Sequence, residues 1–208
     1  MFEVEKDQPH SIMKAKLLFL FLLTSLFFSA NAQENTELEV SQTTKKKKST
    51  SGIETGLLGV WGHNEMRLSD QIALRTEIGF NAGIWGGLFY PKAGFVLLPV
   101  ITAEPRWYYN LEKRVRKSRD TSGNSANFIS LQTSYHPDWF YISNYDNLIT
   151  FNTVTFIPTW GIKRSIGEHF IYATAFGIGY GHQFRSSKGY EDIEDIAVNI
   201  HLRIGYKF

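Results

Sequence analysis

The sequence AVNIHLRIGYKF, residues 197–208, decides the fold class. Hydrophobic and aromatic residues occupy every second position of it, and the intervening positions are small, polar or charged. A period of two is typical of a β-strand whose two faces meet different environments. The hydrophobic face consists of Val198, Ile200, Leu202, Ile204, Tyr206 and Phe208, and the other face of Ala197, Asn199, His201, Arg203, Gly205 and Lys207.

The same alternation recurs upstream, which predicts further strands. We identify seven, at residues 53–65, 71–84, 94–109, 127–136, 149–163, 168–182 and 196–208. About 9 to 11 residues suffice for a tilted strand to cross a bilayer, and barrels of the outer membrane normally have an even number of strands. We therefore expect an all-β fold: a single closed antiparallel up-and-down β-barrel of eight strands. The eighth strand is expected upstream of Ile53 or around residues 83–94.

The N-terminal region carries the features of a secretory signal peptide. A hydrophobic run, residues 17–28, follows Lys14 and Lys16 and ends in an A-x-A pattern at Ala30 and Ala32. About twelve apolar residues would span about 18 Å as a helix, too short for a membrane core of about 30 Å. The pattern predicts a signal peptide over 1–32 that is cleaved before Gln33. The acidic residues before Met13 suit a signal peptide poorly, so Met13 is the alternative translation start.

Residues 33–52 contain few apolar side chains and a run of four lysines, Lys45 to Lys48. Such a composition cannot bury enough surface to order itself. We expect a disordered periplasmic linker here and an outer-membrane barrel over 53–208. A lysine run can also bind anionic lipid headgroups.

The composition excludes some classes of protein. The 208 residues include no cysteine, which removes disulfides and cysteine metal sites. The 22 basic and 20 acidic residues nearly cancel, so no global charge field favours nucleic acid. The six histidines show no metal-binding spacing, and we expect no metal or cofactor. The mean hydropathy of −0.21 does not exclude a membrane barrel, since its strands hide apolar residues at alternate positions.

Aromatic residues near the expected strand ends predict an interfacial girdle of the kind found in membrane barrels. Its expected members are Trp61, Trp85, Trp107, Tyr109, Tyr135, Trp160, Tyr180 and Tyr206.

The connections between strands suggest which end of the barrel faces which compartment. Residues 67–70 and 164–168 are short connections, as periplasmic turns are, whereas 138–148 and 184–194 are longer and are expected outside. The connection 111–127 is long but strongly basic, and its side stays open. Its candidate anion contacts are Lys113, Arg114, Arg116, Lys117 and Arg119, with lipopolysaccharide phosphates in reach if it faces outward; a solvated turn is the simpler interpretation.

Three segments carry a resemblance to a known group of proteins. EPRWYYNL (104–111), WGIKR (160–164) and RIGYKF (203–208) resemble uncharacterised small outer-membrane β-barrel proteins of Bacteroidota type. The resemblance covers most of residues 52–208 and implies fold and location only. The terminal Phe208 looks like the aromatic end by which the outer-membrane assembly machinery recognises barrels.

Charged residues on the polar faces predict an ion-pair network inside the barrel. Unpaired charges in a narrow lumen would each cost several kcal/mol of desolvation. The expected members are Arg75, Glu77, Glu104, Arg106, His201 and Arg203. A binding or gating site for a polar solute is the alternative interpretation of the same residues.

Catalytic motifs are weak. The glycines of residues 177–181 alternate along a strand and so differ from a phosphate-binding loop, which precedes a helix. Ser134 and His136 share a strand face, a spacing that permits a nucleophile and base pair of a lipid-modifying barrel enzyme, although such neighbours arise often by chance.

The sequence therefore predicts a monomeric, non-enzymatic barrel of the Gram-negative outer membrane with a structural, surface-interaction or small-ligand role. Eight strands leave too little space for a general porin. Its expected partners are outer-membrane lipid, lipopolysaccharide and the assembly machinery. The alternatives are a lipid-modifying barrel enzyme and a soluble periplasmic lipocalin-like barrel, in which the hydrophobic faces would point inward and the charged faces outward.

Overall fold

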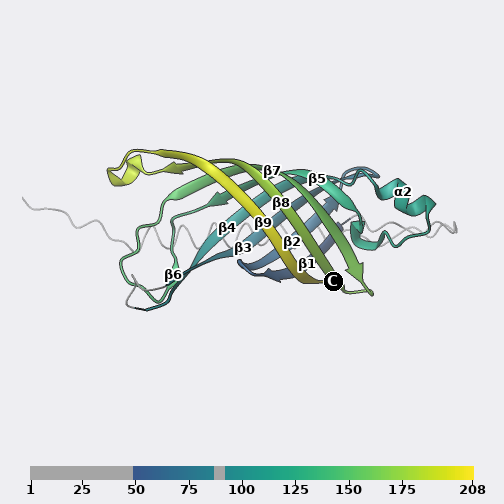
Figure 1. The fold of residues 1–208 in the computed structure, drawn as a ribbon, viewed down its shortest axis with the longest axis horizontal. Helices are drawn as coiled ribbons and strands as arrows, with labels where there is room; N and C mark the ends of the chain where they lie inside the picture. Colours follow the sequence, from purple (N-terminus) through teal and green to yellow (C-terminus); the bar gives the residue numbers. More distant parts are fainter. Residues whose placement is uncertain (1–48, 87–91) are drawn as a thin grey trace, which may run out of the picture. The chain divides into compact units, whose positions relative to one another are not determined.

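The computed structural model describes residues 49–86 and 92–208, and these form an antiparallel sheet that closes on itself (Figure 1). Alternating polar and apolar residues form the strands, and connections rich in Gly, Asn, Asp and Ser separate most of them. The strands are β1 (Ser49–Gly56), β2 (Gly59–Arg67), β3 (Ile72–Trp85), β4 (Gly94–Trp107), β5 (Asn127–His136), β6 (Ile142–Ser143), β7 (Asn152–Ile166), β8 (Phe170–Phe184) and β9 (Ile193–Lys207). Short helices α2 (Leu111–Arg116), η1 (Ser122–Asn124) and η2 (Ser186–Lys188) lie in the connections.

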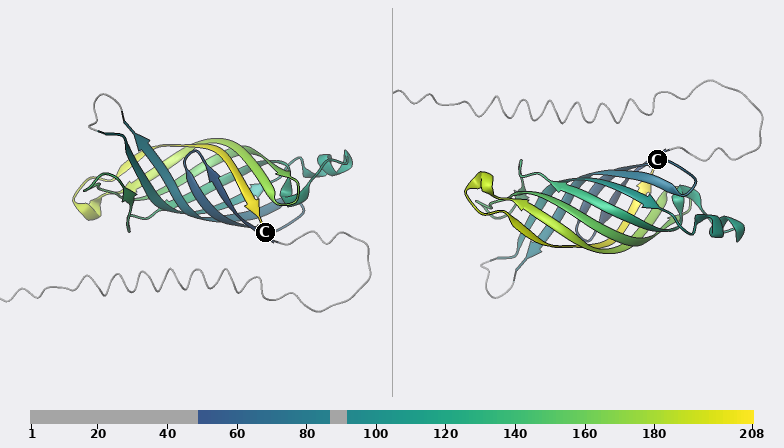
Figure 2. Two further views of the ribbon diagram at one scale, coloured as in Figure 1. Left: turned by 90° about the horizontal axis from the view of Figure 1, so that it is seen from below. Right: turned by 90° about the horizontal axis from the view of Figure 1, so that it is seen from above.

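Eight long strands complete the ring. Each pairs with its neighbours along the chain, and β1 pairs antiparallel with β9, for example Ile53 with Tyr206. The two-residue β6 lies outside the ring order and pairs with β4 at Val96 and Leu97. Figure 2 shows the strands wound obliquely around a common axis. The predicted all-β, eight-stranded antiparallel fold is confirmed.

The eighth strand arises from the segment 53–65, for which the sequence predicted one long strand. Residues 53–65 are two strands, because a two-residue turn at Leu57 and Leu58 separates β1 from β2. The prediction of one strand over 53–65 is therefore wrong. Gly59 adopts a φ of +148°, and a Cβ there would collide with the carbonyl oxygen of Phe80, so this turn requires glycine.

The N-terminal predictions are only partly within reach of the structure. The expected signal peptide, 1–32, and residues 33–48 of the expected linker lie outside the described residues. Residues 49–52 belong to β1, so the barrel begins at Ser49 rather than at Ile53.

The two faces of the sheet differ sharply. Ile200 and Leu202 point outward and are 65% and 53% exposed, whereas Arg75 points inward and is fully buried. The same division holds along β7 and β8, where Trp160 and Ile178 are exposed. Hydrophobic side chains therefore cover the outside of the barrel, and charged side chains lie inside it.

The connections fall into two groups at opposite ends of the barrel. The terminal end, as we call it, carries Phe208, the β2–β3 turn (68–71), the β4–β5 connection (108–126) and the β7–β8 turn (167–169). The loop end carries the β5–β7 and β8–β9 connections, together with the ends of β3 and β4 at Trp85 and Gly94. The basic connection 111–127, whose side the sequence left open, thus lies at the same end as the two short turns and the C-terminus (Figure 1).

Candidate functional site

The lumen contains a buried charge network near the terminal end. Six strands contribute to it, and it balances four carboxylates against four cations. Its members are Glu54, Glu65, Glu77, Glu104, Arg75, Arg106, Lys163 and Arg203. Each of these residues lies on the polar face of its strand. The alternation that places hydrophobic side chains on the outside therefore places these charges inside.

Arg75 joins one side of the buried charge network. Its guanidinium lies 2.6 Å from a carboxylate oxygen of Glu54 and 2.5 Å from one of Glu77. Arg203 donates to both oxygens of Glu77, each at 2.9 Å, and its guanidinium lies over the ring of Trp61 at 3.6 Å. Each carboxylate here therefore meets at least one cation.

Glu65 joins the other side of the buried charge network. It accepts hydrogen bonds from Lys163 at 2.8 Å, from the hydroxyl of Tyr108 at 3.0 Å and from the amide of Asn124 at 2.5 Å. The guanidinium of Arg75 lies 3.6 Å from the same carboxylate. Asn124 belongs to η1, so this carboxylate also ties the β4–β5 connection to the barrel wall.

Glu104 and Arg106 form a further ion pair in the network, at 2.7 Å. Ser130 of β5 donates to the second oxygen of Glu104 at 2.6 Å. The guanidinium of Arg106 lies over the ring of Phe128, 4.3 Å from its centroid. The carboxylate and the guanidinium on β4 are thus both held by side chains of β5.

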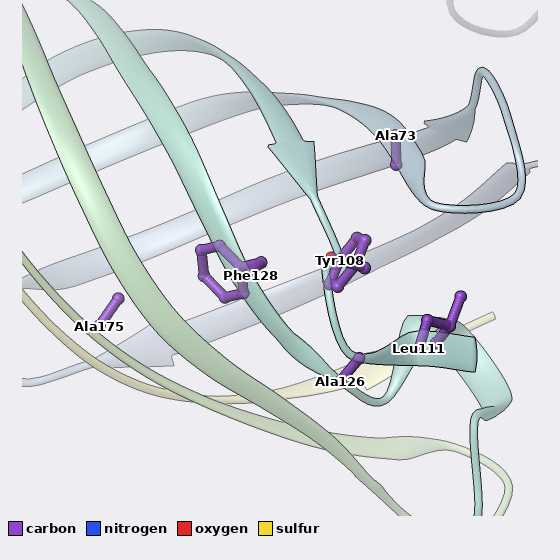
Figure 3. Packing of buried hydrophobic residues seen from close by; sticks show 6 residues of the cluster. All are labelled: Ala73, Tyr108, Leu111, Ala126, Phe128 and Ala175. Carbon is purple, nitrogen blue, oxygen red and sulfur yellow. The ribbon is translucent and has the colours of Figure 1, made fainter. Parts of the chain in front are cut away.

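A hydrophobic cluster lies inside the barrel beside this network, and one member, Leu111, belongs to α2 (Figure 3). The rings of Tyr108 and Phe128 meet edge to face at 5.8 Å. Gly161 leaves space for Phe128, because a Cβ there would come within 2.4 Å of that ring. The cluster consists of Ala73, Tyr108, Leu111, Ala126, Phe128 and Ala175. Together, charges and rings fill the lumen at this end.

The structure places all six predicted network residues inside the barrel and joins five of them in ion pairs. His201 is the exception: it is buried, but its Nε2 has no hydrogen-bond partner and it forms no ion pair among the described residues. The sequence analysis missed Glu54, Glu65 and Lys163. Their inward parity was a usable signal, since each stands on the polar face of its strand.

A cavity of about 350 Å³ occupies the lumen on the loop side of the network. Trp61 and Arg203 line the cavity on the side of the network. Uncharged polar groups line much of the rest: Asn81, Thr102, Gln132, Ser134, His136, Thr155 and Asn199. Such a mixed lining suits a small ligand with polar groups.

Ser134 and His136 both line this cavity, but they are not paired with each other. The hydroxyl of Ser134 is 2.8 Å from that of Thr102. The Nε2 of His136 is 2.8 Å from the amide of Asn81. The nucleophile and base arrangement permitted by their spacing is therefore absent from this conformation.

Most of the predicted aromatic girdle lies on the outside of the barrel. Near the terminal end, the hydroxyl of Tyr109 accepts a hydrogen bond from Trp160 at 3.0 Å and its ring meets that of Trp107. Tyr206, on the same end, is also exposed. Toward the loop end, Tyr135 and Tyr180 occupy outward-facing positions. The outward-facing aromatic residues therefore lie toward both ends of the barrel.

Trp61 lies inside the barrel. Its side chain is 4% exposed, donates to Asn81 at 2.9 Å and stacks on Arg203. The prediction is wrong because Trp61 shares the inward parity of His63 and Glu65 on β2.

Trp85 occupies an inward-facing position of β3, next to the exposed Ile84, and its ring packs on that of Tyr145. The girdle prediction is therefore wrong for Trp85 as well.

The basic residues of the β4–β5 connection are mostly exposed. Lys113, Arg116, Lys117 and Arg119 face solvent on and after α2, and Arg114 donates to the carbonyl of Asp120. At the opposite end, the amides of Ser186 and Arg185 donate to Asp192 and lower the pKa of that carboxyl.

The described residues contain neither a metal-binding cluster nor a membrane-spanning helix. No three histidine or acidic side chains in residues 49–86 and 92–208 lie together in a way that could hold a metal ion. In the same part of the chain, no helix is long and apolar enough to cross a membrane.

Comparisons with known proteins add no relative. No family model matches the chain, and no curated protein or solved structure matches it either. The resemblance to Bacteroidota barrels therefore stays a prediction.

Proposed function

We propose that the mature chain is an integral β-barrel of a Gram-negative outer membrane, closed to diffusion, with a structural, surface-interaction or small-ligand role. The observation that carries this proposal is the arrangement of its two faces. Isoleucine, leucine and aromatic side chains cover the outside, while eight balanced charges fill the inside.

A water-soluble barrel would need the opposite arrangement. A lipocalin-like protein buries its hydrophobic faces around an apolar ligand and exposes its charges, because water solvates them. Here the residues that such a protein would expose, among them Arg75, Glu104 and Arg106, are almost completely buried. A continuous hydrophobic exterior of this kind is stable in lipid.

The termini give the proposed orientation. If the chain ends lie in the periplasm, the β5–β7 and β8–β9 connections reach the cell surface and can contact lipopolysaccharide. The basic residues Lys113 to Arg119 then lie on the periplasmic side, where anionic phospholipid headgroups or solvent are their neighbours. This orientation places them away from lipopolysaccharide, the anion first considered for them.

The proposed route to the membrane depends on both chain ends. A signal peptide over residues 1–32 would direct export, and Phe208 would present the aromatic end to the assembly machinery. We propose a monomer, since the ring of strands closes within one chain.

Catalysis is the second candidate function, and the geometry favours it less. A lipid-modifying enzyme needs a nucleophile within hydrogen-bond reach of its base. Ser134 and His136 instead bond to Thr102 and Asn81. We therefore propose a non-enzymatic role.

Export and insertion test this proposal. The full chain, expressed in a Gram-negative host, should be found in the outer-membrane fraction and resist extraction by alkaline carbonate. Purified protein in planar bilayers should show no steady conductance, because the buried charge network and the hydrophobic cluster fill the lumen. Recovery in the soluble periplasmic fraction would overturn the membrane location, and stable open channels would overturn the closed lumen.

A further inference from the structure

The barrel wall is incomplete beside the β1–β2 hairpin. This hairpin is short. β1 pairs with β9 only between the Gly56–Arg203 pair and the terminal end of the barrel. Residues 193–202 of β9 therefore pair only with β8. On β3, Ala82 still donates to the carbonyl of Leu58, and residues 83–85 pair only with β4. Figure 2 shows the hairpin ending part-way along the barrel. We call this interruption the side opening. It lies between β9 and β3, on the loop side of the hairpin.

The side chains around the side opening are hydrophobic. The β1–β2 turn forms its edge on the side of the terminal end. In this turn, Leu57 and Leu58 are 73% and 51% exposed. On β9, Val198 and Ile200 point outward beside it. Turns at a water interface are normally polar, so a Leu-Leu turn indicates that the hairpin ends within the hydrocarbon layer. The side opening thus faces lipid rather than water.

The cavity on the loop side of the charge network reaches the side opening. Its lining includes Leu57, Leu58, Val198, Ile200 and Leu202, which belong to the outer surface, as well as residues of the lumen. A cavity enclosed by a complete wall would have only inward-facing side chains. The hydrocarbon layer and the polar lumen therefore meet here.

The polar part of the cavity is almost uncharged. Three amides, Asn81, Gln132 and Asn199, line it, and its only permanently charged group, Arg203, already binds Glu77. The Nδ2 of Asn199 and the Nδ1 of His136 are buried without a hydrogen-bond partner. Buried polar atoms of this kind are stabilised by a partner, which a ligand can provide.

We propose that this cavity binds a single-chain amphiphile from the membrane, with an uncharged hydroxyl- or amide-bearing head in the lumen and its hydrocarbon tail in the side opening. An ionised head would need a free counter-charge, and the lining provides none. A cavity of about 350 Å³ suits a head of a few heavy atoms and the first part of one tail. The proposal rests on the membrane location proposed above.

The test uses Trp61 as a reporter of the tail. Replacing Trp85, Trp107, Trp139 and Trp160 with Phe leaves Trp61, which lines the cavity, as the only tryptophan. The protein is placed in phosphatidylcholine nanodiscs that contain a monoacylglycerol brominated on its tail, because bromine quenches tryptophan on contact. The comparison probes are fatty acid and phosphatidylcholine brominated at the same carbons. Native mass spectrometry of the chain with all five tryptophans, released from nanodiscs, measures bound monoacylglycerol independently.

A matched pair of variants separates binding in the cavity from contact with bulk lipid. Ala197→Phe places a ring in the cavity, whereas Ile196→Phe, one residue earlier, adds a ring on the outer surface. We expect monoacylglycerol to quench Trp61 more strongly than either comparison probe. Quenching and the bound mass should be lost in Ala197→Phe and kept in Ile196→Phe.

The outcomes distinguish this inference from the proposed location. Equal quenching by all three probes, or quenching that survives Ala197→Phe, would overturn the amphiphile site. An inserted protein without bound monoacylglycerol would overturn it too, while leaving the membrane location intact. A protein that does not insert into nanodiscs would contradict both.

Discussion

Glu65→Gln should lower the free energy of unfolding by about 3 to 5 kcal/mol, the usual result when one partner of a buried ion pair is removed. The carboxylate of Glu65 accepts from Lys163 and Tyr108 and lies within 4 Å of two guanidiniums. Without its charge, the network has four cations and three carboxylates, and most of these groups are almost fully buried. Urea unfolding in lipid vesicles measures the change.

Two further variants control this measurement. Glu112→Gln removes an equal charge from the exposed face of α2 and should change the free energy of unfolding by less than about 0.5 kcal/mol. Adding Lys163→Met to Glu65→Gln restores the charge balance and should recover part of the lost stability. A loss below about 1 kcal/mol for Glu65→Gln would show that the network does not stabilise the barrel.

Ile178→Lys should cost about 2 to 4 kcal/mol in a bilayer, because its side chain lies on the outer face in the middle of β8. The same change on a water-exposed surface is nearly neutral. The control is Tyr190→Lys, in the β8–β9 connection, where a similarly exposed aromatic side chain lies outside the strands. Urea unfolding in phosphatidylcholine vesicles should separate the two variants, and equal stabilities would contradict burial of Ile178 in lipid.

The alternation made the fold predictable, because a strand that separates two environments must change polarity at every residue. In 197–208 this pattern is unbroken, and the structure confirms there which side chains face outward and which face the lumen. The β1–β2 turn was not predicted, because its residues lack the polar signal of a turn. Leu57 and Leu58 continue a hydrophobic stretch, and turns are recognised in a sequence by polar residues.

The sequence predicts which side chains point into the barrel, but not which of them form ion pairs with each other. Parity alone places Glu104 and Arg106 inside. It cannot pair Glu65 with Lys163, which lie 98 residues apart and meet only because the sheet curves into a ring. The cavity was not predictable for the same reason, since its walls come from strands that are distant in sequence.

The most direct test of the membrane barrel is which face of β9 meets lipid. The chain has no cysteine, so single cysteines at positions 198 to 204 can each carry a nitroxide spin label in reconstituted vesicles. In a membrane barrel, collisions with oxygen, which concentrates in hydrocarbon, should be frequent at 198, 200, 202 and 204 and infrequent at 199, 201 and 203. Uniform accessibility, or high accessibility at the odd positions, would contradict it.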